Sequence, residues 1–229
     1  MRNLELAPCR SMADLARKLN VSIEQARQVL DSSSQENVPE SSQEVRESSQ
    51  QSVPSEKGAI FCHDATERGI PRPQDEADQK LYYSGKKKKH TVKNVLLIDQ
   101  KLSILFLSDT VEGKRHDKKI ADETPYPLPA GSRLLQDLGF QAFTLGGVET
   151  IMPFKKPRGM ELTPEQKAAN RQVSQRRVRI EHVNSSIKRC RIVKDVIRLL
   201  KDGVRDMVME VCSALHNFRV YWSPWQPMT

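Results

Sequence analysis

Residues 92–99 read VKNVLLID and residues 103–109 read SILFLSD, two apolar runs of strand length that are separated by a short turn. Both runs are rich in aliphatic residues and bounded by polar ones, which is typical of strands buried in a sheet. Two further runs have the same character, AIFCHD at residues 59–64 and SRLLQD at residues 132–137. The four runs predict strands of one sheet, and each ends on an aspartate.

Helical signals lie between and after these strands. The charged segment HDKKIADE, residues 116–123, predicts one short helix, and a proline-rich connection and a longer loop with KKPRG come later. Thr163 and Pro164 form a helix start, and helical spacing of apolar residues continues to about Leu200. Residues 205–220 predict a final amphipathic helix. The order indicates an α/β domain in which helices flank a sheet.

The chain before this domain divides into two parts. Within residues 11–30, apolar residues recur at helical spacing on both sides of Asn20, which predicts two short helices. This N-terminal helical module, assigned to residues 1–30, fits either a DNA-binding helix-turn-helix or a plain helical hairpin. Residues 31–57 are acidic, repeat the unit SSQ and offer almost nothing to bury, so we expect a disordered linker. The domain itself is expected over residues 58–225.

The length and net charge of the chain limit its domain content and the classes of molecule that it can bind. The 229 residues provide one ordinary domain plus a small module, and 37 Lys and Arg against 29 Asp and Glu give a net charge of +8. This excess of positive charge favours a polyanionic binding partner, and nucleic acid is the leading candidate. No apolar run approaches the roughly 20 residues of a spanning helix, and the N-terminus lacks a signal-peptide core, so a cytoplasmic protein is expected. The four cysteines contain no C-x-x-C pair, so we expect free thiols.

Three acidic residues are candidates for a metal-dependent phosphodiester chemistry. Such chemistry needs several carboxylates that converge on two cations roughly 4 Å apart. Asp64 and Asp137 end predicted strands, and Glu181 lies at the edge of the apolar stripe of the long basic helix, beside Ile180 and Val183. Composition alone does not distinguish them, because the chain has 29 acids and most acids are solvated.

The local sequences around these acids carry a resemblance. In order along the chain, the stretches are DATERGIPRPQD, YYSGKKKKHTVKN, GKRHDKKIADE, LPAGSRLLQDLGFQ, KKPRGMELTPEQKAANR and RVRIEHVNSSIKRCRIVKD. Together they resemble the DDE superfamily endonucleases of bacterial insertion sequences, of the insertion-sequence-five type that is related to Harbinger-type transposases. The resemblance covers roughly residues 60 to 225.

The resemblance implies an RNase H-like fold with Asp64, Asp137 and Glu181 as the catalytic and metal-binding triad. It also implies two Mg²⁺ (or Mn²⁺) ions and a transposase that cuts and joins DNA at insertion-sequence ends. We expect a homodimer on DNA, associated with the nucleoid when bound. Such enzymes carry the helical signature Tyr, two residues, Arg, three residues, Glu, six residues, Lys, which Arg177, Glu181 and Lys188 match, whereas Ser174 replaces the tyrosine.

The resemblance leaves an alternative open. Only about sixty residues precede Asp64, whereas related transposases have a larger helical region there. A truncated or inactive relic that acts as a DNA-binding protein is therefore the second hypothesis.

Other residues have two interpretations each. Six cations are predicted to contact DNA phosphates, with a merely solvated surface as the alternative: Lys86, Lys87, Lys88, Lys89, Arg177 and Lys188. His116 and Asp117 match a family motif near the site, but a local hydrogen bond between them is the plainer interpretation. Trp222 and Trp225 are expected to anchor the C-terminal tail, with stacking on an extruded base as the alternative.

Overall fold

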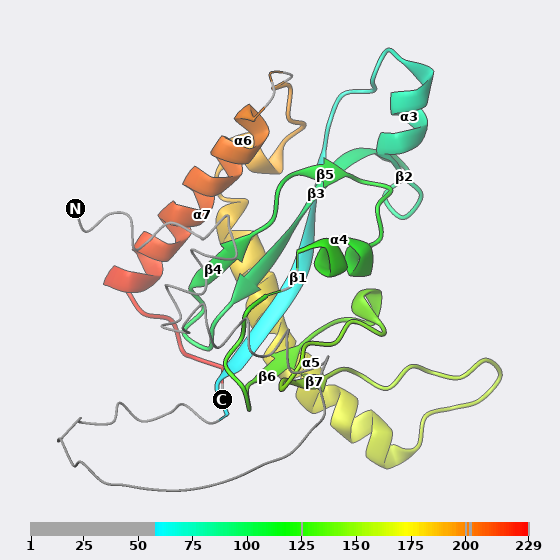
Figure 1. Cartoon of the computed structure of the whole chain (residues 1–229), viewed down its shortest axis with the longest axis vertical. Helices are drawn as coiled ribbons and strands as arrows, with labels where there is room; N and C mark the ends of the chain where they lie inside the picture. Colours follow the sequence, from blue (N-terminus) through cyan, green and yellow to red (C-terminus); the bar gives the residue numbers. More distant parts are fainter. Residues whose placement is uncertain (1–57, 125, 200, 202, 229) are drawn as a thin grey trace, which may run out of the picture.

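The computed structural model describes residues 58–228 except residues 125, 200 and 202. The predicted N-terminal helical module and the linker lie outside the described residues. The described part is a mixed α/β domain whose central sheet is flanked by helices (Figure 1). No helix within it is long and apolar enough to cross a membrane.

The sheet is built around strands β1 (Ile60–Gly69) and β3 (Lys89–Ile98), which pair antiparallel from Cys62↔Ile98 to Gly69↔Thr91. On the far side of β3 lie three short strands: β2 (Tyr83–Ser84), β4 (Ile104–Leu107) and β5 (Val111–Glu112). On the other side of β1, strands β6 (Arg133–Leu135) and β7 (Glu149–Ile151) run parallel to it, which gives the order β2-β3-β1-β6-β7. The four predicted strands are therefore confirmed.

The helices differ from the prediction in places. They are α3 (Glu76–Tyr82), α4 (Asp117–Glu123), the 3₁₀ turn η2 (Leu138–Phe140), α5 (Pro164–Ile187), α6 (Arg191–Lys194) and α7 (Val204–Trp222). Helix α5 begins as predicted, with a capping box between Thr163 and Gln166. The prediction that it continues to Leu200 is wrong, because the backbone turns extended at Cys190 (φ −71°, ψ 106°). The apolar spacing persists beyond this break in Val193 and Ile197, which are buried.

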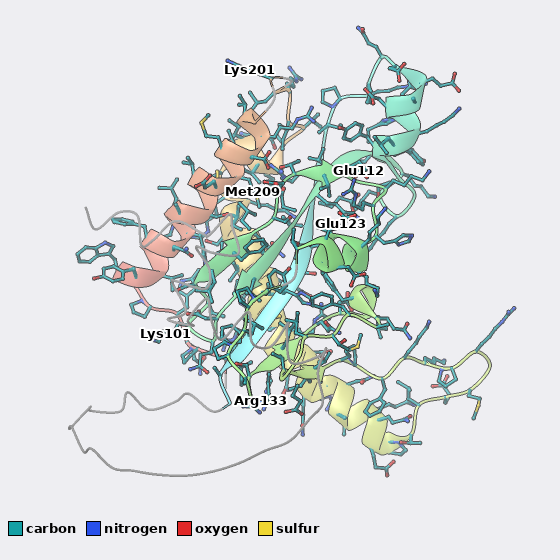
Figure 2. The ribbon with its side chains drawn as sticks, in the orientation of Figure 1. Lys101, Glu112, Glu123, Arg133, Lys201 and Met209 are labelled. Atoms are coloured by element: carbon teal, nitrogen blue, oxygen red, sulfur yellow. The ribbon has the colours of Figure 1, made fainter. Side chains whose placement is uncertain are left out.

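Side chains alternate between the two faces of the sheet, as the two-residue period of a strand requires. On one face, Cys62, Leu96 and Ile98 pack against Ile180 and Val183 of α5, as well as against α7. Figure 2 shows Met209, which is fully buried, on the sheet-facing side of α7. The opposite face carries a second cluster with residues from α4 and η2. Helix α5 therefore lies directly over β1 and fixes which of its residues face the sheet.

The C-terminal tail is anchored by one tryptophan rather than two. Trp225 packs on the core and makes an edge-on contact with His216, with the two ring centroids 5.4 Å apart. The backbone N–H of Met228 then donates to the carbonyl of Gln100. Trp222 is 69 % exposed, so the expectation that it helps to hold the tail is wrong.

Candidate active site

Asp64 lies in the middle of β1, not at its end as predicted. The strand continues to Gly69 because its pairing with β3 runs unbroken through Asp64↔Leu96. By the alternation of the strand, Asp64 shares the face of Ile60 and Cys62, which is the face that α5 covers. The carboxylate therefore points into the space between sheet and helix.

Asp137 follows β6 by two residues, so the prediction that it lies at the carboxyl end of a strand is confirmed. The parallel register pairs Cys62 with Leu135, and two further residues along each strand lead to Asp64 and Asp137. Because neighbouring strands lie about 4.8 Å apart, the two acids come from adjacent positions on one face. Asp137 caps η2 through its own carboxylate, which accepts from Leu138 N–H at 2.7 Å.

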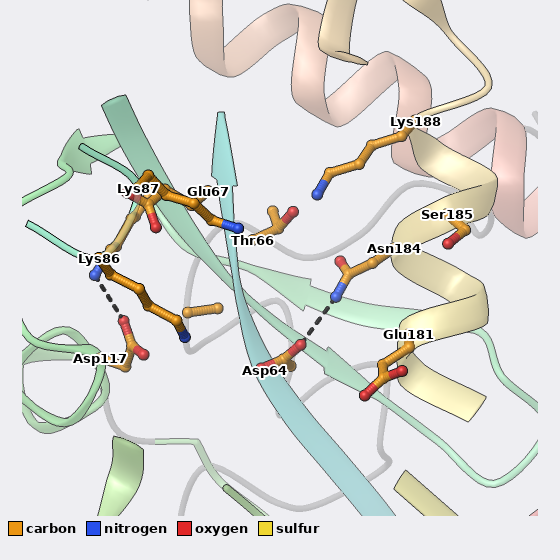
Figure 3. Close-up of a pocket in the computed structure, with 12 residues that line it drawn as sticks. Asp64, Thr66, Glu67, Lys86, Lys87, Asp117, Glu181, Asn184, Ser185 and Lys188 are labelled. Carbon is orange, nitrogen blue, oxygen red and sulfur yellow. Dashed lines mark hydrogen bonds and ion pairs between the residues drawn. The ribbon is translucent and has the colours of Figure 1, made fainter. Parts of the chain in front are cut away.

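Glu181 projects from α5 toward the same space. Ile180, Val183 and Ile187 anchor this part of the helix in the core, and Glu181 stands beside them at the exposed edge. The residues three, four and seven positions after Glu181 lie on the same side of the helix as Glu181. These are Asn184, Ser185 and Lys188, and Figure 3 shows all four along α5, across the cavity from Asp64.

These elements enclose a cavity of about 300 Å³. Its lining combines acids with lysines and comes from β1, β3, α4, α5 and the loop before β3: Asp64, Ala65, Thr66, Glu67, Lys86, Lys87, Lys93, Asp117, Glu181, Asn184, Ser185 and Lys188. Asp64 and Glu181 are thus brought to one cavity, whereas Asp137 lies beside it and is not among the lining residues.

Burial and neighbouring charges act on Asp64. Loss of water raises its pKa to about 6, and the carboxylates of Asp137 and Asp117 add to the rise, whereas Arg177 opposes it. The Nδ2 group of Asn184 donates to Oδ2 of Asp64 at 3.0 Å. An ionised Asp64 is therefore costly in this environment, and a cation near it would relieve that cost.

Lysines also line the cavity. Lys188 points inward from α5, and burial together with the charge of Lys87 lowers its pKa. Lys86 and Lys87 line the cavity from the β2–β3 loop, whereas Lys88 and Lys89 are exposed outside it. Of the six predicted phosphate contacts, the structure thus brings Lys86, Lys87 and Lys188 to the cavity.

Arg177, a predicted phosphate contact, forms an ion pair with Asp137. Its Nη1 lies 3.4 Å from Oδ1 of Asp137, and its side chain is only 15 % exposed. The spacing of four residues does place Arg177 and Glu181 on one side of α5. However, Arg177 lies one turn nearer the start of the helix than Glu181, and its side chain reaches Asp137.

Asp117 also lines the cavity, which favours the site-related interpretation of the His116–Asp117 motif. Its Oδ1 accepts from Nζ of Lys93 at 3.1 Å, whereas His116 precedes α4 without a side-chain capping bond. The plainer interpretation, a local bond between the two residues, is wrong for Asp117. Lys93 and Asn184 were not anticipated at all. Their only signals are a lysine inside an apolar strand and an amide three residues after Glu181.

The oxygen donors suit a hard divalent cation, although they are not gathered at one point. Within the described residues, no group of three or more His, Cys, Asp or Glu side chains is arranged to hold a metal ion. One buried acceptor next to Asp64 nevertheless lacks a hydrogen-bond partner, the Oδ1 atom of Asn184. Carboxylate and amide oxygens are ligands that Mg²⁺ accepts. Asp64, Glu181 and Asn184 therefore fit such an ion chemically.

A second cavity lies on the other side of Ser185, which lines both. It is lined by Arg179, His182, Ser185, Ser186, Arg189, Trp225 and Gln226. None of these described residues is acidic. Arg179 donates to the neutral amide oxygen of Gln226 at 3.1 Å, so its charge is not neutralised by that contact. Basic surface therefore continues across α5 from the first cavity to the second.

Comparisons with known proteins identify a family for this chain. The profile of a family described as DDE superfamily endonuclease matches residues 63–217. The chain is 32% identical over 146 residues to the "Probable transposase for insertion sequence element IS702" of Microchaete diplosiphon. The match covers 64% of this chain and 52% of that protein, so the chain spans about half the length of this curated relative. No solved structure matches the chain.

Proposed function

Because the chain belongs to the DDE superfamily endonucleases, we propose that it is a transposase that cuts and joins DNA strands at insertion-sequence ends. The observation that carries the proposal is the cavity in which Asp64 faces Glu181 and whose lining also includes four lysines. Carboxylates suit divalent cations and lysines suit phosphates, so this combination fits a phosphodiester. The similarity to a probable transposase supports the same activity.

We assign Asp64, Asp137 and Glu181 as the catalytic triad that holds two divalent ions, Mg²⁺ or Mn²⁺. Bound there, such ions would supply activation of the attacking oxygen and stabilisation of the leaving oxygen. The support is positional: two acids come from adjacent strands and the third from the helix above them. The strand order, with β1 central and β6 and β7 parallel to it, supports assignment to the RNase H-like fold.

The other residues of the cavity are proposed to place the DNA. Lys86, Lys87 and Lys188 would contact phosphates at the cavity. Arg177 would hold Asp137 in position, through the contact of 3.4 Å, and would not contact DNA itself. The second cavity, with Arg179 and its neighbours, offers a continuation of the phosphate path across α5.

The remaining parts of the proposal concern the chain beyond the cavity. We propose that residues 1–30 form a DNA-binding module, residues 31–57 a linker and residues 58–225 the catalytic domain. The family match over residues 63–217 falls within the last of these. The protein would act in the cytoplasm, on the nucleoid, and as a homodimer that bridges two DNA ends.

A nicking assay tests the activity. Supercoiled plasmid that carries the element's ends is incubated with the protein in Mg²⁺, in Mn²⁺ or in EDTA. We expect nicked product with either metal and none in EDTA, and no product from Glu181→Gln with metal. DNA binding without metal-dependent cleavage by the parent protein would instead support the inactive relic.

A further inference from the structure

The outer side of α7 is apolar over its whole length. The helix has six exposed residues, and all of them are large and hydrophobic. Their exposed fractions are 56 % for Met207, 53 % for Val211, 47 % for Leu215, 49 % for Phe218, 66 % for Tyr221 and 69 % for Trp222. A surface helix normally presents its polar face to water, so this distribution is inverted. Such a surface is typical of a site that a protein partner covers.

The spacing of this stripe suits another helix. Val204, Met207, Val211, Ala214, Phe218 and Tyr221 follow one another at intervals of three, four, three, four and three residues. This is the heptad spacing that places side chains along one seam between two packed helices. The charged residues Glu210 and Arg219 are only partly exposed and lie on the two sides of the stripe, whereas Arg205 and Asp206 lie nearer the buried face and bond to Leu199 and Thr110. The stripe is therefore apolar in the middle and polar at its edges, as protein interfaces are.

From these observations we infer that two copies of the chain associate through α7, with the stripe of one packed against the stripe of the other. The area supports this partner. An aromatic side chain buries about 150–250 Å², so Phe218, Tyr221 and Trp222 together expose about 350 Å². Met207, Val211 and Leu215 add about 200 Å². Two such faces bury a little over 1,000 Å² of apolar side chain, about the lower limit of a specific interface.

The association leaves the catalytic cavity accessible. None of the residues described as lining that cavity belongs to α7, so packing at α7 covers neither active site. A self-complementary face related by a twofold axis also closes after two copies. The particle is therefore a dimer with two open cavities, and it forms without DNA or metal. This distinguishes the inference from the dimer on DNA that the proposed function expects.

Sedimentation velocity of the full chain, without DNA or metal and across about 1–100 µM, tests the inference. We expect a monomer–dimer equilibrium in the micromolar range, because the area is at the lower limit. Phe218→Glu and Val211→Glu place a charge in the seam and should weaken association at least ten-fold. Phe154→Glu is the matched control, since Phe154 is 52 % exposed but lies outside α7, and it should associate like the parent.

Circular dichroism checks that the variants remain folded. Two separate seam variants are used so that a folding defect in one of them does not decide the result. A parent chain that is monomeric throughout the range overturns the inference, as does a dimer that both seam variants leave intact. If the parent chain is monomeric, acrylamide quenching of Trp222 fluorescence in a Trp225→Phe variant shows whether another part of the chain covers α7. Shielding there would assign the face to residues 1–57 of the same chain.

Discussion

Replacing Asp64 by asparagine should abolish cleavage and at the same time stabilise the metal-free protein. The substitution keeps the size of the side chain and an oxygen that accepts from Asn184, but it removes the negative charge. In the parent, burial raises the pKa of Asp64 to about 6, with Asp137 and Asp117 contributing. The ionised carboxylate is therefore unfavourable in the folded state at neutral pH. Asp64→Asn removes this cost together with the proposed metal ligand.

The size of the effect follows from the pKa. A rise from 3.8 to about 6 is roughly 2 units, and each unit corresponds to about 1.4 kcal/mol. The upper limit is thus about 3 kcal/mol, and we expect about 2 kcal/mol because water in the open cavity screens part of the charge. Since the folded pKa is raised, the protonated form stabilises the fold below pH 4, and this stabilisation is lost as the pH rises through 6. The advantage of the variant should therefore develop between pH 4 and pH 6.

Thermal unfolding in EDTA measures the stability, and nicking of supercoiled DNA measures the activity. At pH 8, Asp64→Asn should melt roughly 4–8 °C above the parent, since 1 kcal/mol shifts the midpoint by about 2–4 °C in a chain of this size. At pH 4 the two midpoints should nearly coincide. Mg²⁺ should raise the midpoint of the parent only. Asp109→Asn, which alters an acid after β4, is the control and should retain cleavage. A variant that melts below the parent at pH 8, or that still cleaves, would refute this reasoning.

Three further changes test separate parts of the site. Asp137→Asn and Glu181→Gln should lose Mg²⁺-dependent cleavage while keeping affinity for DNA in a mobility-shift assay, and near-parental nicking by either would exclude that acid from the triad. Lys188→Gln should weaken DNA binding and reduce the slope of log affinity against log salt by about 1, so an unchanged slope would argue against a phosphate contact. Ile180→Ala should lower the free energy of unfolding by about 2–5 kcal/mol in urea, because the side chain is fully buried between α5 and the sheet, and a loss under 1 kcal/mol would contradict its role in the core.

The central strands and the long helices could be predicted because each leaves a period in the sequence. Residues 95–98 and 104–107 are all buried, so each forms a continuous apolar run. Strands β2 and β5 have two residues each, which is too short for any period to be detected. The end of α5 was missed for a related reason. Val193 and Ile197 continue the apolar spacing beyond the break at Cys190, so hydrophobicity alone does not mark where the helix stops.

The site could be predicted only as far as side chains point along regular elements. Glu181 was placed correctly at the edge of a buried helical stripe because helical spacing decides that position. Lys93 and Asp117 meet in the cavity from β3 and α4, 24 residues apart in the chain, and no local pattern encodes such a contact. The position of Asp64 within β1 was missed because the partly exposed, polar half of that strand resembles a loop in composition.

The spacing along α5 also places Ser174, the position of the tyrosine in the signature that the chain resembles, away from the residues that line the cavity. An α-helix rises 1.5 Å per residue, so Arg177 stands about 6 Å before Glu181, and Lys188 about 10 Å beyond it. This matches their contacts, with Arg177 at Asp137 beside the cavity and Lys188 inside it. Ser174 lies another 4–5 Å before Arg177, further from the cavity, and it is not among the described residues that line it. A hydroxyl in place of an aromatic ring therefore changes the exposed surface of α5 one turn before Arg177, at a distance from Asp64 and Glu181.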